Sequence, residues 1–78
     1  MAPAKGVEIN GAAVRAIREL RGISLSVFAR DVGISVGYAC NVEKGYKNSV
    51  SPEVREAIRR RLDVSIDAIS YVGAGTAA

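Results

Sequence analysis

The sequence has no histidine and no tryptophan, and it has a single cysteine among 78 residues. One cysteine excludes an internal disulfide, and without histidine the ligand set of a zinc finger is missing. No apolar run approaches the roughly 18 residues of a membrane span, and no apolar signal core follows the opening MAPAKG. We therefore expect one small cytoplasmic domain that uses no metal or other cofactor and binds neither membranes nor small molecules.

Residues that enzymes commonly use are also scarce. The chain has no histidine, no clustered carboxylates and no phosphate-binding glycine loop, so it is not expected to be an enzyme. A hydrophobic share of 49% and a charged share of 24% instead favour an ordered globular domain.

Charge is unevenly distributed along the chain. Residues 44–61 contain six basic and two acidic side chains, whereas residues 62–78 contain two acidic side chains and no basic one. A basic middle favours a polyanion on one face of the fold, although basic helical faces are also often merely solvated.

Five helices are predicted, because the apolar residues recur at intervals of three and four rather than two. Pro52 in the first turn strengthens the start of the fourth helix, and residues 46–50 are expected to form a polar loop. Glycines 22, 33 and 45 are expected to end the first three helices. The predicted N-caps are Asn10, Ser24, Ser35, Ser51 and Ser65.

The predicted domain spans residues 10–72, between a flexible N-terminal arm (residues 1–9) and a flexible C-terminal tail (residues 73–78). Ala13 and Leu20 are expected beside the apolar face of the first helix. The inward-facing residues are expected to be Val14, Ile17, Phe28, Val32, Ala39, Val42, Val54, Ala57, Ile58, Leu62, Ile66 and Ile69.

The segment FARDVGIS has the spacing of a helix-turn-helix. Ala29 is small enough for a second helix to cross close to it, Gly33 supplies a positive-φ residue, and Ser35 caps the next helix. Such a unit leaves its second helix free to enter a major groove, although any helical bundle with a glycine turn has this local spacing.

From Val14 to Ile69 the chain resembles the lambda-repressor-like family of helix-turn-helix domains, also called the Cro/repressor or XRE type. The matching segments are VRAIRELRGIS, FARDVGIS, YACNVEKG and SPEVREAIRRRLDVSIDAI. The resemblance implies an all-α, compact five-helix domain that binds double-stranded DNA with its third helix in the major groove.

The family pattern assigns two groups of residues to DNA. The expected base contacts are Ser35, Val36, Gly37, Cys40, Asn41 and Lys44. The expected phosphate contacts are Arg18, Tyr38, Tyr46, Lys47, Asn48 and Arg55.

Several of these residues have a second interpretation. Asn41 either pairs with adenine N6 and N7 or is a solvated surface residue, and Cys40 is either a groove contact or a small packed residue. Val36 is expected to pack on a thymine methyl group, and Gly37 permits a close approach to the bases. With one amide on this face, sequence preference is expected to depend on thymine methyl groups and DNA shape.

The family also pairs an arginine of the first helix with a glutamate near the end of the third. These residues are Arg18 and Glu43, and their pair either orients the guanidinium toward a phosphate or is purely structural. The triplet Arg59, Arg60 and Arg61 is expected to be mainly structural or solvated, with nonspecific attraction of DNA as the second interpretation. Leu25 departs from the family, because many relatives have a phosphate-binding glutamine there.

The predicted function is a sequence-specific transcription regulator, specifically a small Cro-like repressor of phage or bacterial origin that acts at the nucleoid. The alternative is an antitoxin that also binds a toxin protein, suggested by the apolar residues Leu25 and Val27. A weak or DNA-induced homodimer is expected. Its seam would include Ile69, Tyr71 and Val72, unless these residues cover the core of their own domain.

Overall fold

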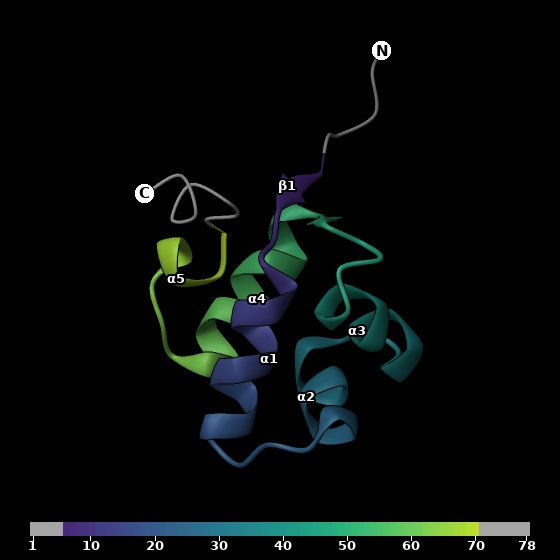
Figure 1. Ribbon diagram of the computed structural model, residues 1–78, viewed down its shortest axis with the longest axis vertical. Coiled ribbons are helices and arrows are strands. Elements are labelled where there is room, and N and C mark those ends of the chain that lie inside the picture. The colour runs from purple at the N-terminus through teal and green to yellow at the C-terminus, as the bar shows by residue number, and fades with distance from the viewer. Residues whose placement is uncertain (1–5, 71–78) are drawn as a thin grey trace.

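Five helices and a short antiparallel ladder make up the part of the chain that the computed structural model describes, residues 6–70. Figure 1 shows this arrangement, and no helix in this part is long and apolar enough to cross a membrane. The helices are α1 (Gly11–Leu20), α2 (Leu25–Val32), α3 (Val36–Glu43), α4 (Pro52–Leu62) and α5 (Ile66–Ser70). The strands are β1 (Val7–Glu8) and β2 (Ser49–Val50).

Four of the five predicted N-caps are confirmed by side-chain hydrogen bonds. Asn10 Oδ1 accepts from the backbone N–H of Ala13 at 3.1 Å, which satisfies one of the free amides of α1. The hydroxyls of Ser24, Ser35 and Ser51 each accept from the amide three residues ahead, at 3.0–3.2 Å. The starts of α1 to α4 therefore follow directly from local sequence, and α5 begins one residue after Ser65.

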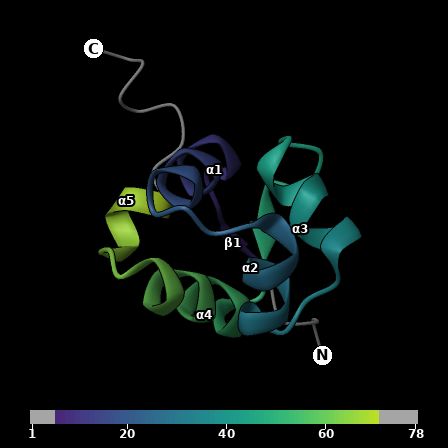
Figure 2. The same ribbon diagram turned by 90° about the horizontal axis from the view of Figure 1, so that it is seen from below.

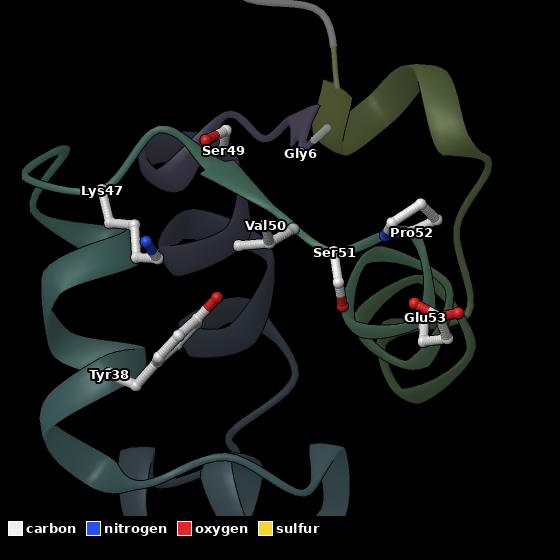
Figure 3. Close-up of a pocket in the computed structure, with 8 residues that line it drawn as sticks. All are labelled: Gly6, Tyr38, Lys47, Ser49, Val50, Ser51, Pro52 and Glu53. Carbon is white, nitrogen blue, oxygen red and sulfur yellow. The ribbon is translucent and has the colours of Figure 1, made fainter. Parts of the chain in front are cut away.

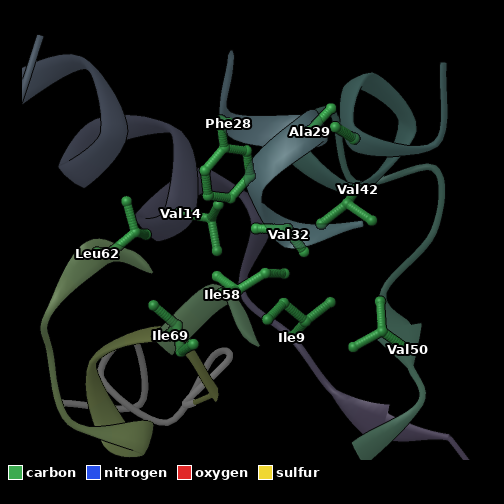
Figure 4. Close-up of a cluster of buried hydrophobic side chains, with 11 residues drawn as sticks. Ile9, Val14, Phe28, Ala29, Val32, Val42, Val50, Ile58, Leu62 and Ile69 are labelled. Atoms are coloured by element: carbon green, nitrogen blue, oxygen red, sulfur yellow. The ribbon is translucent and has the colours of Figure 1, made fainter. Parts of the chain in front are cut away.

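The core draws side chains from all five helices and from both strand segments (Figure 4). Phe28 and Ile58 are among its largest side chains and are at most 1% exposed. Leu20, which the sequence places beside the apolar face of α1, is instead 84% exposed at the end of that helix. The buried apolar residues are Ile9, Val14, Phe28, Ala29, Val32, Ala39, Val42, Val50, Ile58, Leu62 and Ile69.

The β1–β2 ladder corrects two of the sequence-based expectations. Val7 pairs with Val50 and Glu8 with Ser49, so the predicted loop 46–50 ends in a strand. The N–H of Ile9 donates to Asn48 O at 3.1 Å, and its side chain is 1% exposed, so the fold begins within the predicted arm. Strands of two residues are too short to show a period-two pattern, which is why the sequence gives no signal for them. The predicted tail, with Tyr71 and Val72, lies outside the described residues.

The N-terminus of α1 lies against the C-terminal end of α3. A Cβ added to Gly11 would lie 1.7 Å from the carbonyl oxygen of Val42, so only glycine permits this approach. In both Figure 1 and Figure 2, α3 and α5 lie on opposite sides of the molecule, with α1 and α4 between them. The outer face of α3 is therefore not covered by any other helix.

On α4, Glu56 accepts hydrogen bonds from two arginines of the next turn. Arg59 Nη2 lies 2.6 Å and Arg60 Nε 3.2 Å from Glu56 Oε2. The hydrogen bond from Arg59 is the main reason why the pKa of Glu56 falls to about 2 from its usual 4.5. The deprotonated carboxylate is thus the form that the folded protein prefers.

The free energy of unfolding should therefore fall as the pH decreases. Because the folded-state pKa of Glu56 is depressed, its contribution is complete above pH 4.5 and is lost as the pH falls toward about 2. Urea unfolding across this range should show a shallower pH dependence for Glu56→Gln than for the parent chain. Arg61 similarly lowers the pKa of Asp31, so part of the dependence should persist in the variant. Identical slopes for the two proteins would contradict this assignment.

Candidate nucleic-acid interface

The turn between α2 and α3 is fixed by backbone geometry. Gly33 has φ 89°, and its N–H donates to Ala29 O at 2.9 Å, as does that of Ile34. Ala29 is 1% exposed and belongs to the core, and α2 packs against α3. A larger residue there would push the helices apart, and a residue with a Cβ at Gly33 would strain the turn. The predicted helix-turn-helix is therefore confirmed.

A buried ion pair joins α1 to the end of α3. Arg18 Nε and Nη2 donate to the two carboxylate oxygens of Glu43, at 2.6 and 3.0 Å, and both residues are 8% exposed. Arg18 Nη1 donates to Ile23 O at 2.7 Å, in the segment between α1 and α2. The hydrogen bond to Glu43 raises the pKa of Arg18 above its usual value. The predicted Arg18–Glu43 pair is confirmed, and each guanidinium nitrogen of Arg18 already has an acceptor within the protein.

The outer face of α3 carries the residues predicted to contact bases. Ser35, Gly37, Asn41 and Lys44 are exposed, and Cys40 is half-buried. Val36 is 45% exposed, and a Cβ added to Gly37 would meet no atom within 4 Å. Ala39, Val42 and Glu43 face inward. The structure thus brings all six predicted base contacts together on α3 and the two residues that cap it, Ser35 and Lys44.

One cleft lies between α3 and the start of α4 (Figure 3). The Nζ of Lys47 lies 5.5 Å from the centre of the Tyr38 ring, a cation–π contact, and both side chains line the cleft. Its far side is the N-terminus of α4, where Ser51 caps the helix. Free amides and a lysine favour an anion, although Glu53 also lines the cleft and opposes one. Tyr46 and Asn48 are exposed in the same loop.

A second cleft, of about 220 Å³, lies on the other side of α3. Arg15 and Lys44 line it together with Leu25, Cys40 and the paired side chains of Arg18 and Glu43. Sequence reasoning missed Arg15, because an exposed arginine on a helix carries no signal of its own until the neighbouring helix is placed. Lys44 has no carboxylate within ion-pair distance among residues 6–70.

Two predicted phosphate contacts, Arg18 and Arg55, make hydrogen bonds to other side chains of the protein. Arg18 is held inside by Glu43, and Arg55 Nη1 donates to Ser70 Oγ of α5 at 3.4 Å. The triplet that follows is structural, as predicted. Arg59 and Arg60 bind Glu56, and Arg61 binds Asp31 of α2 at 2.7 Å.

Comparisons with known proteins agree with this geometry. The sequence profile of the helix-turn-helix family matches residues 14–69, whereas curated proteins give no match. The solved structures that are similar to this chain include the following three. The biofilm regulator SinR of Bacillus subtilis in complex with DNA has 28% identity and a TM-score of 0.70, over 74% of this chain and 95% of that one. The clp gene regulator ClgR of Corynebacterium glutamicum has 32% identity and a TM-score of 0.72, over 87% of each chain.

The third similar structure is a chain of the SinR protein/SinI protein complex. It has 26% identity and a TM-score of 0.75. The match covers 85% of this chain, which spans 64% of the length of that one.

Replacing Arg18 by methionine should strongly destabilise the fold. The substitution leaves the Glu43 carboxylate buried without its partner, which should lower the free energy of unfolding by about 3–5 kcal/mol in urea titrations. Arg15→Met is the matched control. Its pair with Glu19 is more than half exposed, so the loss should stay below about 1 kcal/mol. A double variant, Arg18→Met with Glu43→Leu, should recover much of the loss. Equal losses for Arg15→Met and Arg18→Met would contradict this account.

Proposed function

Because this chain belongs to the helix-turn-helix family, we propose that it is a sequence-specific repressor that places α3 in the major groove of DNA. The observation that carries the proposal is the asymmetry of α3. Its inner face is fixed by Ala39, Val42 and the buried Glu43, whereas its outer face is exposed and uncovered. A helix held in this way can present a defined set of side chains to base edges without rearrangement.

Asn41 is the proposed hydrogen-bonding reader. It is exposed on the outer face of α3, one residue after Cys40, and its side-chain amide matches the N6 and N7 atoms of adenine. Ser35 is a weaker candidate, because its hydroxyl already accepts the Tyr38 amide as the helix cap. Base recognition by hydrogen bonds therefore rests mainly on one side chain.

The two clefts beside α3 are proposed to hold the phosphates on either side of the groove. On one side Lys47, Tyr38 and the N-terminus of α4 face the anion. On the other side Arg15 and Lys44 do so. Arg15 and Lys44 would thereby replace the glutamine that the family commonly uses where this chain has Leu25.

DNA binding is proposed to involve a weak or DNA-induced homodimer, with its two copies of α3 about 34 Å apart. Ile69 is fully buried in the core of its own domain, so it is not available for the seam. This chain shares its fold with a regulator solved in complex with DNA, which supports the proposed placement of α3 in the groove.

A partner protein is the second candidate function, and one observation favours it. Leu20 is 84% exposed at the end of α1, which leaves a large apolar side chain in water. Coexpression with the product of the adjacent gene should yield a complex that Leu20→Glu disrupts and that the matched control Arg30→Glu does not. A single free species in all three preparations would contradict a partner at this position.

Substitutions at Asn41 and Lys47 should have different effects on DNA recognition. The binding site is first obtained by selection from a random duplex pool. Asn41→Ala should then reduce the ratio between specific and nonspecific affinity, because a base contact is lost. Lys47→Ala should weaken binding to all sequences alike and reduce the log–log salt slope by about 0.9. Fluorescence anisotropy across a salt series measures both effects.

Arg60→Ala is the charge-matched control for Lys47→Ala. Arg60 is paired with Glu56 on α4 and lines neither cleft beside α3, so its removal should leave the salt slope unchanged. If Asn41→Ala and Lys47→Ala weakened binding to every sequence equally, the proposed roles on α3 would be wrong. Failure to enrich any sequence from the pool would contradict sequence-specific binding itself.

A further inference from the structure

The outer face of α3 from Val36 to Cys40 is poor in hydrogen-bonding side chains. Val36 has none, Gly37 has no side chain, and the thiol of Cys40 is only a weak donor and acceptor. Ser35 uses its hydroxyl oxygen to accept the Tyr38 amide at 3.0 Å. The part of the reading helix that enters a groove most deeply is therefore nearly apolar.

Val36 and Cys40 form one apolar strip on this helix. They are four residues apart, so their Cβ atoms lie about 5–6 Å from each other on the same face. Val36 is 45% exposed, one of three large hydrophobic residues that are exposed within residues 6–70. Cys40 lies beside Leu25 in the second cleft, which places apolar atoms along that side of the strip. Beside Val36, the open space at Gly37 leaves room for a base edge to approach.

The cations around the strip indicate what covers it. Lys44 lies one turn beyond Cys40, and Lys47 lies in the loop that follows the helix. Because Lys47 lines the first cleft and Lys44 the second, a cation lies on each side of α3. This arrangement matches a polyanion that carries an apolar group between two rows of negative charge. Among base edges in the major groove, the only apolar group is the methyl on C5 of thymine, and 5-methylcytosine carries the same group at the same ring position.

We propose that Val36 and Cys40 recognise the C5-methyl group of pyrimidines, so that binding responds to cytosine methylation as well as to thymine. This inference rests on the proposed function, because it requires α3 to lie in the major groove. It adds a chemical class of ligand: the strip distinguishes methylated from unmethylated C5, independently of the hydrogen bonds made by Asn41.

Replacing thymine by deoxyuridine tests the methyl contact directly, because it removes the methyl group and keeps every hydrogen-bonding atom. The test uses the full chain and the duplex recovered by selection, with one thymine replaced at a time. At the positions that face Val36, each replacement should raise the Kd about fourfold, the effect of losing one buried methyl group. In duplexes where such a thymine is changed to cytosine, methylation of that cytosine should lower the Kd about fourfold.

Two variants assign the effect to the strip. Val36→Ala should abolish the difference between thymine and deoxyuridine at its position, and Val36→Thr should reduce it by placing a hydroxyl against the methyl group. Asn41→Ala is the control and should retain the difference. Val36 is exposed, so these variants should fold, which thermal unfolding verifies.

The outcomes separate this inference from the function on which it rests. Equal affinity for thymine and deoxyuridine at every position, with sequence-specific binding intact, would overturn the inference and leave the proposed function standing. A methyl effect that persisted undiminished in Val36→Ala would overturn the assignment to this strip. The absence of any selected sequence would overturn both proposals.

Discussion

The buried pair between Arg18 and Glu43 is the interaction on which the rest of the structure depends. It joins α1 to the end of α3 and, through Ile23 O, to the chain that leads into α2. A carboxylate near the exposed end of a DNA-facing helix would repel phosphate, and its burial beside a guanidinium neutralises it. Gly11 also allows α1 to lie close to the end of α3, because its missing Cβ leaves space for Val42 O.

Pairing of charges inside the fold decides which cations are left for DNA. The basic triplet of α4 is bound to Glu56 and Asp31, and Arg55 is turned toward α5. Lys44 and Lys47 line the clefts beside α3, as does Arg15, whose pair with Glu19 is more than half exposed. The positive charge available to a polyanion thus lies beside the exposed helix, although four of the eleven basic residues are in α4.

Local chemistry explains how much could be predicted from the sequence. The N-caps, the turn at Gly33 and the core face of each helix depend on neighbours three or four residues away, so the sequence contains them. The burial of Ile9 and Val50 depends on pairing between distant segments, and the exposure of Leu20 depends on where α1 ends relative to its neighbours. Likewise, Arg15 becomes part of the candidate site only when α3 is placed beside it. Sequence reasoning therefore identified α3 and its exposed face but missed one side of its surroundings.

The central claim is that the outer face of α3 is the DNA-reading surface. Amide chemical shifts of the ¹⁵N-labelled chain, titrated with the selected duplex, test it most directly. We predict the largest changes from Ser35 to Lys44 and at Lys47, with little change in α5, which lies on the opposite side of the molecule. Changes centred on α5, with α3 unaffected, would contradict the account.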